Sequence, residues 1–268
     1  MSCILLTLSI YELQRLLINR RAWASAIAFV LFWLGCLFYF ILRGAALLED
    51  EESRPILQSL LGALGMSSWY DWSRVEVALY SLFAVLVLPL LLVFWSADQT
   101  ASDRQRGTLR FISLRSSRNS IFYGRFLGHC WVAFILLAFT ALTFLLGIVL
   151  VGNFSLAVLG STLIVLFNGV LAAFPIVALM AFLSARASSP RQAILQSFLL
   201  YIGLLIVFSM ITHYLPALEF IHYLRPSYYA FEVVKLAEWH SLQLAHVPLL
   251  QTVIFLALGQ WTINRSAL

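Results

Sequence analysis

Six long stretches of apolar residues divide the chain, and each is nearly free of charged side chains. Each stretch is close to the roughly 20 residues that an α-helix needs to cross the hydrocarbon core of a bilayer. Polar and charged residues gather between the stretches. The pattern predicts an all-α membrane protein, with six transmembrane helices in a single transmembrane domain over residues 1–268. The predicted spans are about 22–42, 76–95, 127–151, 156–183, 193–212 and 247–263.

Residues 5–21 precede the first span and follow a different pattern. Their apolar positions recur every three or four residues, and their polar positions fall on the opposite side. The apolar positions are Leu6, Ile10, Leu13 and Leu17, and the polar positions are Glu12, Arg15 and Asn19. We therefore expect an amphipathic helix that lies along the membrane surface.

Three further segments lie between spans. Residues 43–75 carry an acidic cluster followed by an apolar stretch, which predicts a short surface helix over 56–64. Residues 96–125 hold six arginines and two aspartates. Residues 213–246 are too polar for a span but rich in leucine and aromatic residues, which favours short helices before the last span.

The composition excludes a soluble globular protein. The chain is 62% hydrophobic and 11% charged, whereas soluble domains carry about a quarter charged residues. The net charge of +5 is distributed unevenly. With the N-terminus inside, the inner segments hold twelve basic and three acidic residues, and the outer segments hold five basic and nine acidic residues. Because basic residues stay on the cytoplasmic side, both termini are expected in the cytoplasm, and nucleic acid is not an expected partner.

The sequence offers little chemistry of its own. We find no paired nucleophile and base, no ligand-like spacing for a metal, and hence no expected catalytic or metal site. A P-loop is excluded because its lysine follows a glycine, whereas the only lysine, Lys235, follows Val234. Among the polar residues inside the spans, four are candidates either for a substrate path or for helix packing. They are Ser161, Asn168, Gln196 and Gln251.

The segment 96–125 resembles the first cytoplasmic loop of ABC-2 type permeases, the membrane subunits of ATP-binding cassette exporters. It reads Asp103, then Arg106-Gly107-Thr108-Leu109, then Ser117-Arg118, with Gly124-Arg125 opening the third span. It departs from the family pattern by having Asp103 where glutamate is usual and no proline before Ser117. Locally, Gly107 permits a tight turn, and the Thr108 side chain is expected to cap the helix that follows.

The resemblance implies the permease subunit of an exporter in the cytoplasmic (inner) membrane of a bacterium. The implied partners are two cassette ATPase subunits, which would bind ATP and Mg²⁺, and a second permease subunit in a homodimer or heterodimer. No cofactor is expected on this chain. The expected ATPase-subunit interface comprises Glu12, Arg15, Asp98, Asp103, Arg104, Arg106, Gly107, Thr108 and Arg110.

Two alternatives remain open from the sequence. One is a polytopic intramembrane enzyme, which needs a nucleophile and a base close together. The other is an ATP-independent carrier or scaffold, which predicts function without a nucleotide-binding partner.

Overall fold

The structure is a computed structural model that describes residues 7, 9–11, 14, 20–50, 54–63, 65–114 and 116–265. Most of the predicted amphipathic helix 5–21, with Glu12 and Arg15, lies outside the described residues. Every regular element in the described ranges is a helix. The all-α fold class predicted from the sequence is confirmed.

Six helical segments are long and apolar enough to cross a membrane, as predicted. They are Trp23–Leu48, Val75–Arg106, Arg118–Val151, Leu156–Arg186, Pro190–Tyr214 and Glu238–Arg265. Their main elements are α2 (Arg20–Gly35), η1 (Cys36–Leu42), α3 (Arg43–Glu49), α5 (Val75–Leu82), η3 (Phe83–Val87), α6 (Leu88–Ser96), α7 (Ala101–Arg106), α9 (Arg118–Val151), α10 (Leu156–Arg186), α11 (Pro190–Tyr214) and α13 (His246–Arg265). The shorter elements are α4 (Arg54–Ala63), η2 (Ser67–Asp71), α8 (Leu109–Ser113), η4 (Pro216–Leu224), α12 (Tyr228–Val233) and η5 (Glu238–Leu244).

Local sequence signals begin and end the long helices. Ser117, Ser155 and Ser189 are N-caps, and each side chain accepts a hydrogen bond from a backbone N–H in the first turn of its helix. Gly107 ends α7 with φ +71°, and Gly152 ends α9 with φ +81°. Glycine suits both positions because it has no Cβ to clash in the left-handed conformation.

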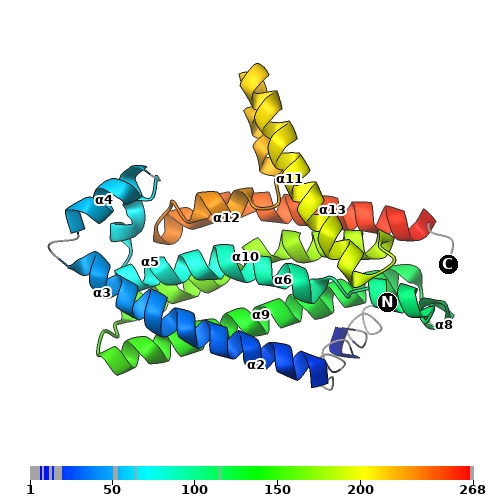
Figure 1. Cartoon of the computed structure of the whole chain (residues 1–268), viewed down its shortest axis with the longest axis horizontal. Helices are drawn as coiled ribbons and strands as arrows, with labels where there is room; N and C mark the ends of the chain where they lie inside the picture. The colour runs from blue at the N-terminus through cyan, green and yellow to red at the C-terminus, as the bar shows by residue number, and fades with distance from the viewer. Residues whose placement is uncertain are drawn as a thin grey trace.

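Helix α10 lies at the centre of the bundle and packs against α5, α6, α9, α11 and α13. Gly169 permits close approach there, because a Cβ at this position would lie 2.6 Å from a methyl carbon of Leu137. Pro175 lies inside α10, and the helix runs through it with helical residues on both sides. Figure 1 shows α5, α6, α9, α10 and α13 running roughly along one axis.

The two ends of this bundle differ in character (Figure 1). We call one the basic end; it carries residues 97–114 and 116–118, residues 184–191 and the end of α13 at Arg265. The opposite end carries residues 54–63 and 65–72, the α9–α10 hairpin and the start of η5.

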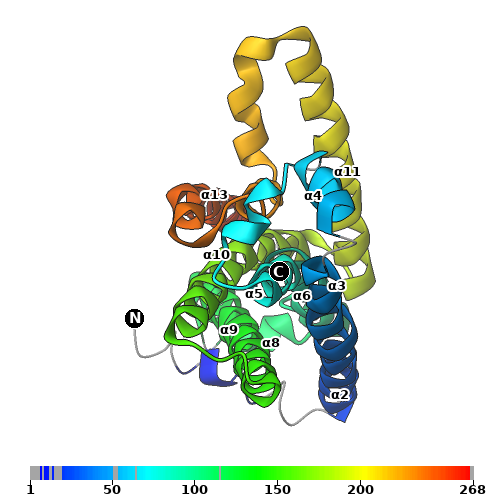
Figure 2. The ribbon, with the colours of Figure 1, turned by 90° about the vertical axis from the view of Figure 1, so that its left-hand side faces the viewer.

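Helix α11 leaves this bundle. It starts at the basic end and rises away from the other helices, and η4 returns alongside it, as Figures 1 and 2 show. Only 6% of the most apolar stretch of α11 is buried. Its base is anchored by an aromatic contact between Phe94 and Phe198, whose ring centroids lie 6.2 Å apart. We call α11 and η4 together the arm.

Candidate functional site

The loop that joins α6 to α9 is the most polar part of the basic end. Its short helices α7 and α8 meet at Gly107 and Thr108. The predicted tight turn at Gly107 agrees with its left-handed backbone. The predicted capping role of the Thr108 side chain is wrong: no side-chain cap bond forms, and Thr108 Oγ1 instead donates to Asp103 Oδ1 at 2.7 Å. Thr108 therefore closes the loop back onto α7 rather than capping α8.

An ion pair fixes this loop to α9. The Arg125 guanidinium donates to a carboxylate oxygen of Asp103 and also to the backbone carbonyl oxygen of Gln99. Arg125 is 4% exposed and Asp103 is 9% exposed. Because a charge-assisted hydrogen bond is stronger than a neutral one and water is excluded here, this pair is a firm contact.

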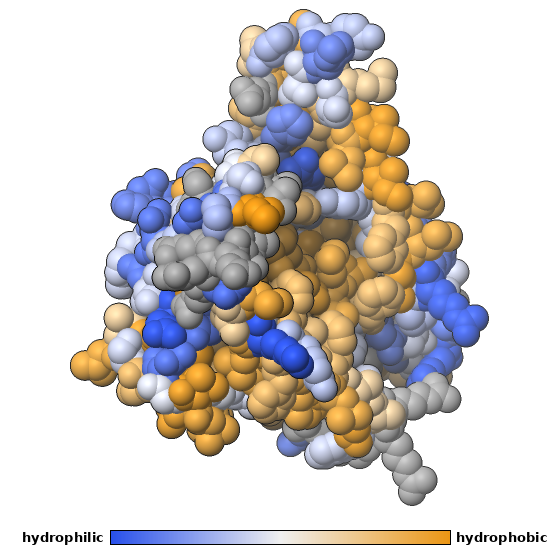
Figure 3. Space-filling model, turned by 60° about the vertical axis from the view of Figure 1, so that its left-hand side comes forward, coloured by the Kyte–Doolittle hydropathy of each residue, from blue (hydrophilic) through white to orange (hydrophobic). Residues whose placement is uncertain are grey.

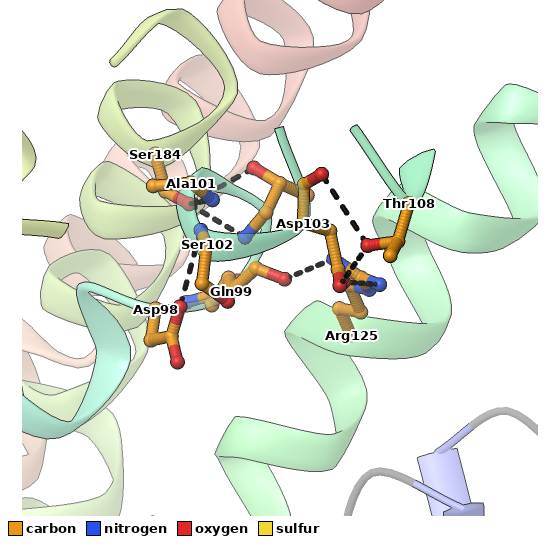
Figure 4. A network of polar contacts seen from close by, with 9 residues as sticks. Asp98, Gln99, Ala101, Ser102, Asp103, Thr108, Arg125 and Ser184 are labelled. Carbon is orange, nitrogen blue, oxygen red and sulfur yellow. Dashed lines mark hydrogen bonds and ion pairs between the residues drawn. The ribbon is translucent and has the colours of Figure 1, made fainter. Parts of the chain in front are cut away.

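Hydrogen bonds to α10 fix the same loop from a second direction (Figure 4). Ser184 Oγ, at the end of α10, accepts from the backbone N–H of Thr100 at 2.7 Å and of Ala101 at 3.1 Å. Gln99 Nε2 donates to the Val177 carbonyl oxygen at 3.1 Å. The Arg104 guanidinium donates to the Ala185 carbonyl oxygen at 2.7 Å. We call Gln99, Asp103, Thr108, Arg125 and Ser184 the loop network.

The residues predicted for the ATPase-subunit interface divide into two sets. Asp103 faces into the chain, and Asp98 is partly buried and accepts from the Ser102 backbone N–H at 3.2 Å. Arg106 and Gly107 are exposed. The side chain of Arg110 lies outside the described residues, like Glu12 and Arg15. Among the predicted interface residues whose side chains the structure describes, Arg106 and Gly107 are therefore the solvent-facing ones, and the loop network lies behind them.

Sequence reasoning missed Gln99, Arg125 and Ser184 as members of this network. The signal for Arg125 was present, because an arginine at the edge of an apolar span is costly unless it has a partner. Gln99 and Ser184 act through the backbone of distant segments, and no spacing in the sequence predicts such contacts.

Three of the four candidate polar residues in the spans hold the segment that precedes α13. Tyr229 Oη donates to Asn168 Oδ1 at 2.9 Å, and Asn168 Nδ2 donates to Ser241 Oγ at 2.6 Å. Burial raises the pKa of Tyr229, so this phenol keeps its proton and can donate. Ser161 Oγ donates to Glu238 Oε1 at 3.0 Å.

Gln251 makes a similar contact from α13. Its Nε2 donates to the carbonyl oxygens of Tyr223 at 2.6 Å and Arg225 at 2.8 Å. These bonds favour the packing interpretation for Ser161, Asn168 and Gln251. The Oε1 atom of Gln196 is buried with no hydrogen-bond partner within the described part of the chain. A substrate path along these residues stays a prediction.

Replacing Asn168 with leucine is expected to destabilise the fold. The change leaves the Tyr229 hydroxyl without its acceptor inside the bundle, at a cost of about 1–3 kcal/mol. It also removes the donor to Ser241 Oγ, which keeps its own bond to the Glu238 carbonyl oxygen. The melting temperature of the purified chain in mild detergent should fall. The control is Thr212→Val, because the Thr212 hydroxyl bonds only to carbonyl oxygens of its own helix. An unchanged melting temperature for Asn168→Leu would contradict the packing interpretation.

The chemistry of the loop network is structural. It consists of hydrogen bonds and one ion pair, and it connects two transmembrane helices to an exposed turn. Among the described residues, no group of three or more His, Cys, Asp or Glu side chains is arranged to hold a metal ion.

Comparison with known proteins supports a transport role. Residues 6–267 match the family described as ABC-2 family transporter protein. No curated protein matches the chain. The family match covers nearly the whole chain and agrees with the six candidate spans. This integral membrane protein therefore belongs to the ABC-2 family of transporter proteins.

Proposed function

We propose that this chain is the permease subunit of an ATP-binding cassette exporter, that it forms the translocation path, and that it couples to a separate ATPase subunit. One observation carries the coupling: the exposed Arg106-Gly107 turn is backed by a buried network that ties it to α9 and α10. A flexible loop would absorb a push from a partner. A loop held by Arg125 and Ser184 can pass it on to the transmembrane helices as a rigid-body movement.

The energy source lies on the partner. ATP and Mg²⁺ would bind to two cassette ATPase subunits, and closure of these subunits would press on the Arg106-Gly107 turn. Arg104 and Arg106 supply positive charge near this surface, and acidic groups on the partner can pair with it. The charge asymmetry of the sequence supports a cytoplasmic location for this end of the bundle and for both termini. The membrane in this proposal is the inner membrane of a bacterium.

The exposed apolar surface of the arm favours a second permease subunit in the complex. Helix α11 presents a row of exposed apolar side chains that its own bundle does not cover; the row includes Leu199, Ile202, Ile206 and Met210. Figure 3 shows apolar side chains around a hollow below the arm. Helix α11 runs across the direction of the other helices rather than along it, as Figure 1 shows. A second copy whose arm packs in this hollow would bury both apolar surfaces in a two-fold arrangement.

Purification of the tagged chain from its native membrane in mild detergent tests the coupling. Mass spectrometry should identify a cassette ATPase in the preparation, and the complex should hydrolyse ATP with sensitivity to vanadate. A preparation that holds no nucleotide-binding partner even after chemical crosslinking would overturn the proposal. That result would favour an ATP-independent carrier or an intramembrane enzyme.

Crosslinking tests the second subunit. Single cysteines at Leu199, Ile202, Ile206 or Met210, in a chain without its natural cysteines, should give a dimer-sized product in membranes with a short bifunctional thiol reagent. Cysteines at Leu142 and Leu146 of α9 are the controls, because they are also exposed but lie off the arm. Equal crosslinking from both helices would contradict a dimer formed through the arm.

A further inference from the structure

Helix α9 does more than hold the loop network. Its first two turns also contact helix α13. The ring of Phe122 lies against Gly259 of α13 so closely that a Cβ at Gly259 would be 2.4 Å from Phe122 Cζ. Tyr123 Oη donates to Gln260 Oε1 at 2.7 Å. Arg118 extends the contact, because its guanidinium donates to the Ile263 carbonyl oxygen at 3.4 Å.

These contacts form one continuous seam. Residues 259, 260 and 263 lie on one side of α13, since positions one, three and four apart fall within about a third of a helical turn. Residues 118, 122 and 123 lie in the first two turns of α9. Arg125, which holds Asp103 and Gln99, is in the next turn of the same helix. The start of α9 therefore holds the loop and α13 at once.

Helix α13 leads from this seam toward the opposite end of the bundle. It is nearly continuous with η5, so that Glu238–Arg265 forms one candidate span. Ser241 of η5 is fully buried and bonds to Asn168 of α10. A displacement of α13 along or about its axis would therefore act directly on η5 and on its bond to Asn168.

We propose that the seam between α9 and α13 is the joint that carries movement of the loop to η5. In this role Tyr123, Gly259 and Gln260 are positioning residues for transport. Gly259 is buried, and the Tyr123 hydroxyl bonds to Gln260 within the chain, so their contacts lie inside the bundle. The inference rests on the proposed function, because it assumes that an ATPase subunit moves the loop.

The seam suits a joint because it combines close backbone approach with a directional bond. Gly259 removes the side chain that would keep the helices apart, and Phe122 fills the space. The Tyr123–Gln260 hydrogen bond fixes how the two helices are rotated relative to each other. Packing alone would let the helices slide, whereas packing with a hydrogen bond between side chains holds one register.

The test uses the permease–ATPase complex purified in mild detergent, where reagents reach both ends of the bundle, and a reporter on η5. His240 is exposed on η5, and a His240→Cys variant without the natural cysteines can be labelled with a water-soluble maleimide. In the complex that carries only this cysteine substitution (the parent), ATP with vanadate should change the labelling rate about fivefold or more. Fivefold is the lower end of the factor by which one coupled site changes another. Gly259→Leu should abolish this change while the ATPase subunit still co-purifies and binds ATP.

Matched variants keep the result interpretable. Gly35→Leu is the control for added bulk, because Gly35 is also helical, at the end of α2, but has nothing within 4 Å of a Cβ placed there. Tyr123→Phe removes one hydroxyl with little change of shape, and it should weaken the nucleotide effect even if Gly259→Leu does not fold. A constant labelling rate in the parent, or a full nucleotide effect in Tyr123→Phe and in any folded Gly259→Leu, overturns the joint. Absence of an ATPase subunit from the parent preparation overturns the proposed function instead.

Discussion

Replacing Arg125 with leucine should lower the free energy of unfolding by about 3–5 kcal/mol, the range for removing one partner of a buried ion pair. The change leaves the Asp103 carboxylate buried with Thr108 as its remaining side-chain partner among the described contacts in the loop network. It also removes the donor that holds the Gln99 carbonyl oxygen. Within the described part of the chain, the loop network then loses its hydrogen bonds to Arg125 of α9 and keeps those to α10. Tryptophan fluorescence during heating of the purified chain in detergent measures the loss.

Two comparisons identify the ion pair as the cause. Arg118→Leu removes an arginine from the same helix that is only partly buried, and it should cost much less. The double variant Asp103→Leu with Arg125→Leu should recover much of the stability, because replacing both partners of a buried pair with apolar residues is often nearly neutral. A double variant as unstable as Arg125→Leu alone would show that the Asp103 charge is not what Arg125 stabilises.

The same double variant separates stability from coupling. If the ion pair serves only the fold, a chain with recovered stability should also recover nucleotide-stimulated function with its partner. If the loop network passes movement to α9, two leucines lack the directional bond that Arg125 makes, and coupling should remain low. Measuring both quantities on one variant distinguishes these roles.

The six spans of the bundle could be predicted from the sequence because the signal for each span lies within that span. Each span is a run of apolar residues of bilayer length, and backbone groups in lipid must bond within the helix. The predicted surface helix 56–64 and the short helices before the last span also have counterparts in α4, η4, α12 and η5. Boundaries are harder to predict: the hydropathy pattern starts the third span at residue 127, whereas α9 begins at Arg118 after the Ser117 cap. Polar residues in the first turns lower the local hydropathy, so a hydropathy pattern places the start of the helix too late.

The contacts of the site could not be predicted, because they join residues far apart in the sequence. Thr108 shows that a contact between near neighbours can also differ from the local expectation. Its position before a helix makes a capping role the local expectation, yet its hydroxyl bonds to Asp103 five residues earlier. Asn168 has two open interpretations from the sequence for a related reason, since its partners Tyr229 and Ser241 lie in a segment whose position only the fold decides.

Replacing Gly107 with tryptophan should reduce the amount of co-purified ATPase subunit about tenfold or more, which corresponds to about 1.4 kcal/mol of binding free energy. Gly107 is exposed, and nothing lies within 4 Å of a Cβ placed there. The new side chain therefore projects from the loop into the space that a partner would occupy. Quantitative mass spectrometry of the purified complex measures the ratio of the two subunits.

A second glycine supplies the matched control. Gly152 also ends a helix with a left-handed backbone and open space around its Cβ position, but it lies in the α9–α10 hairpin at the opposite end. Any residue other than glycine costs about 1–2 kcal/mol in this conformation, so both tryptophan variants should lose similar stability. Only Gly107→Trp should lose the ATPase subunit. If both variants retain it equally, the Arg106-Gly107 turn is not the docking surface; if both lose it equally, the loss reflects backbone strain rather than blocked contact. The pair of variants thus tests the position of the interface independently of the stability of the fold.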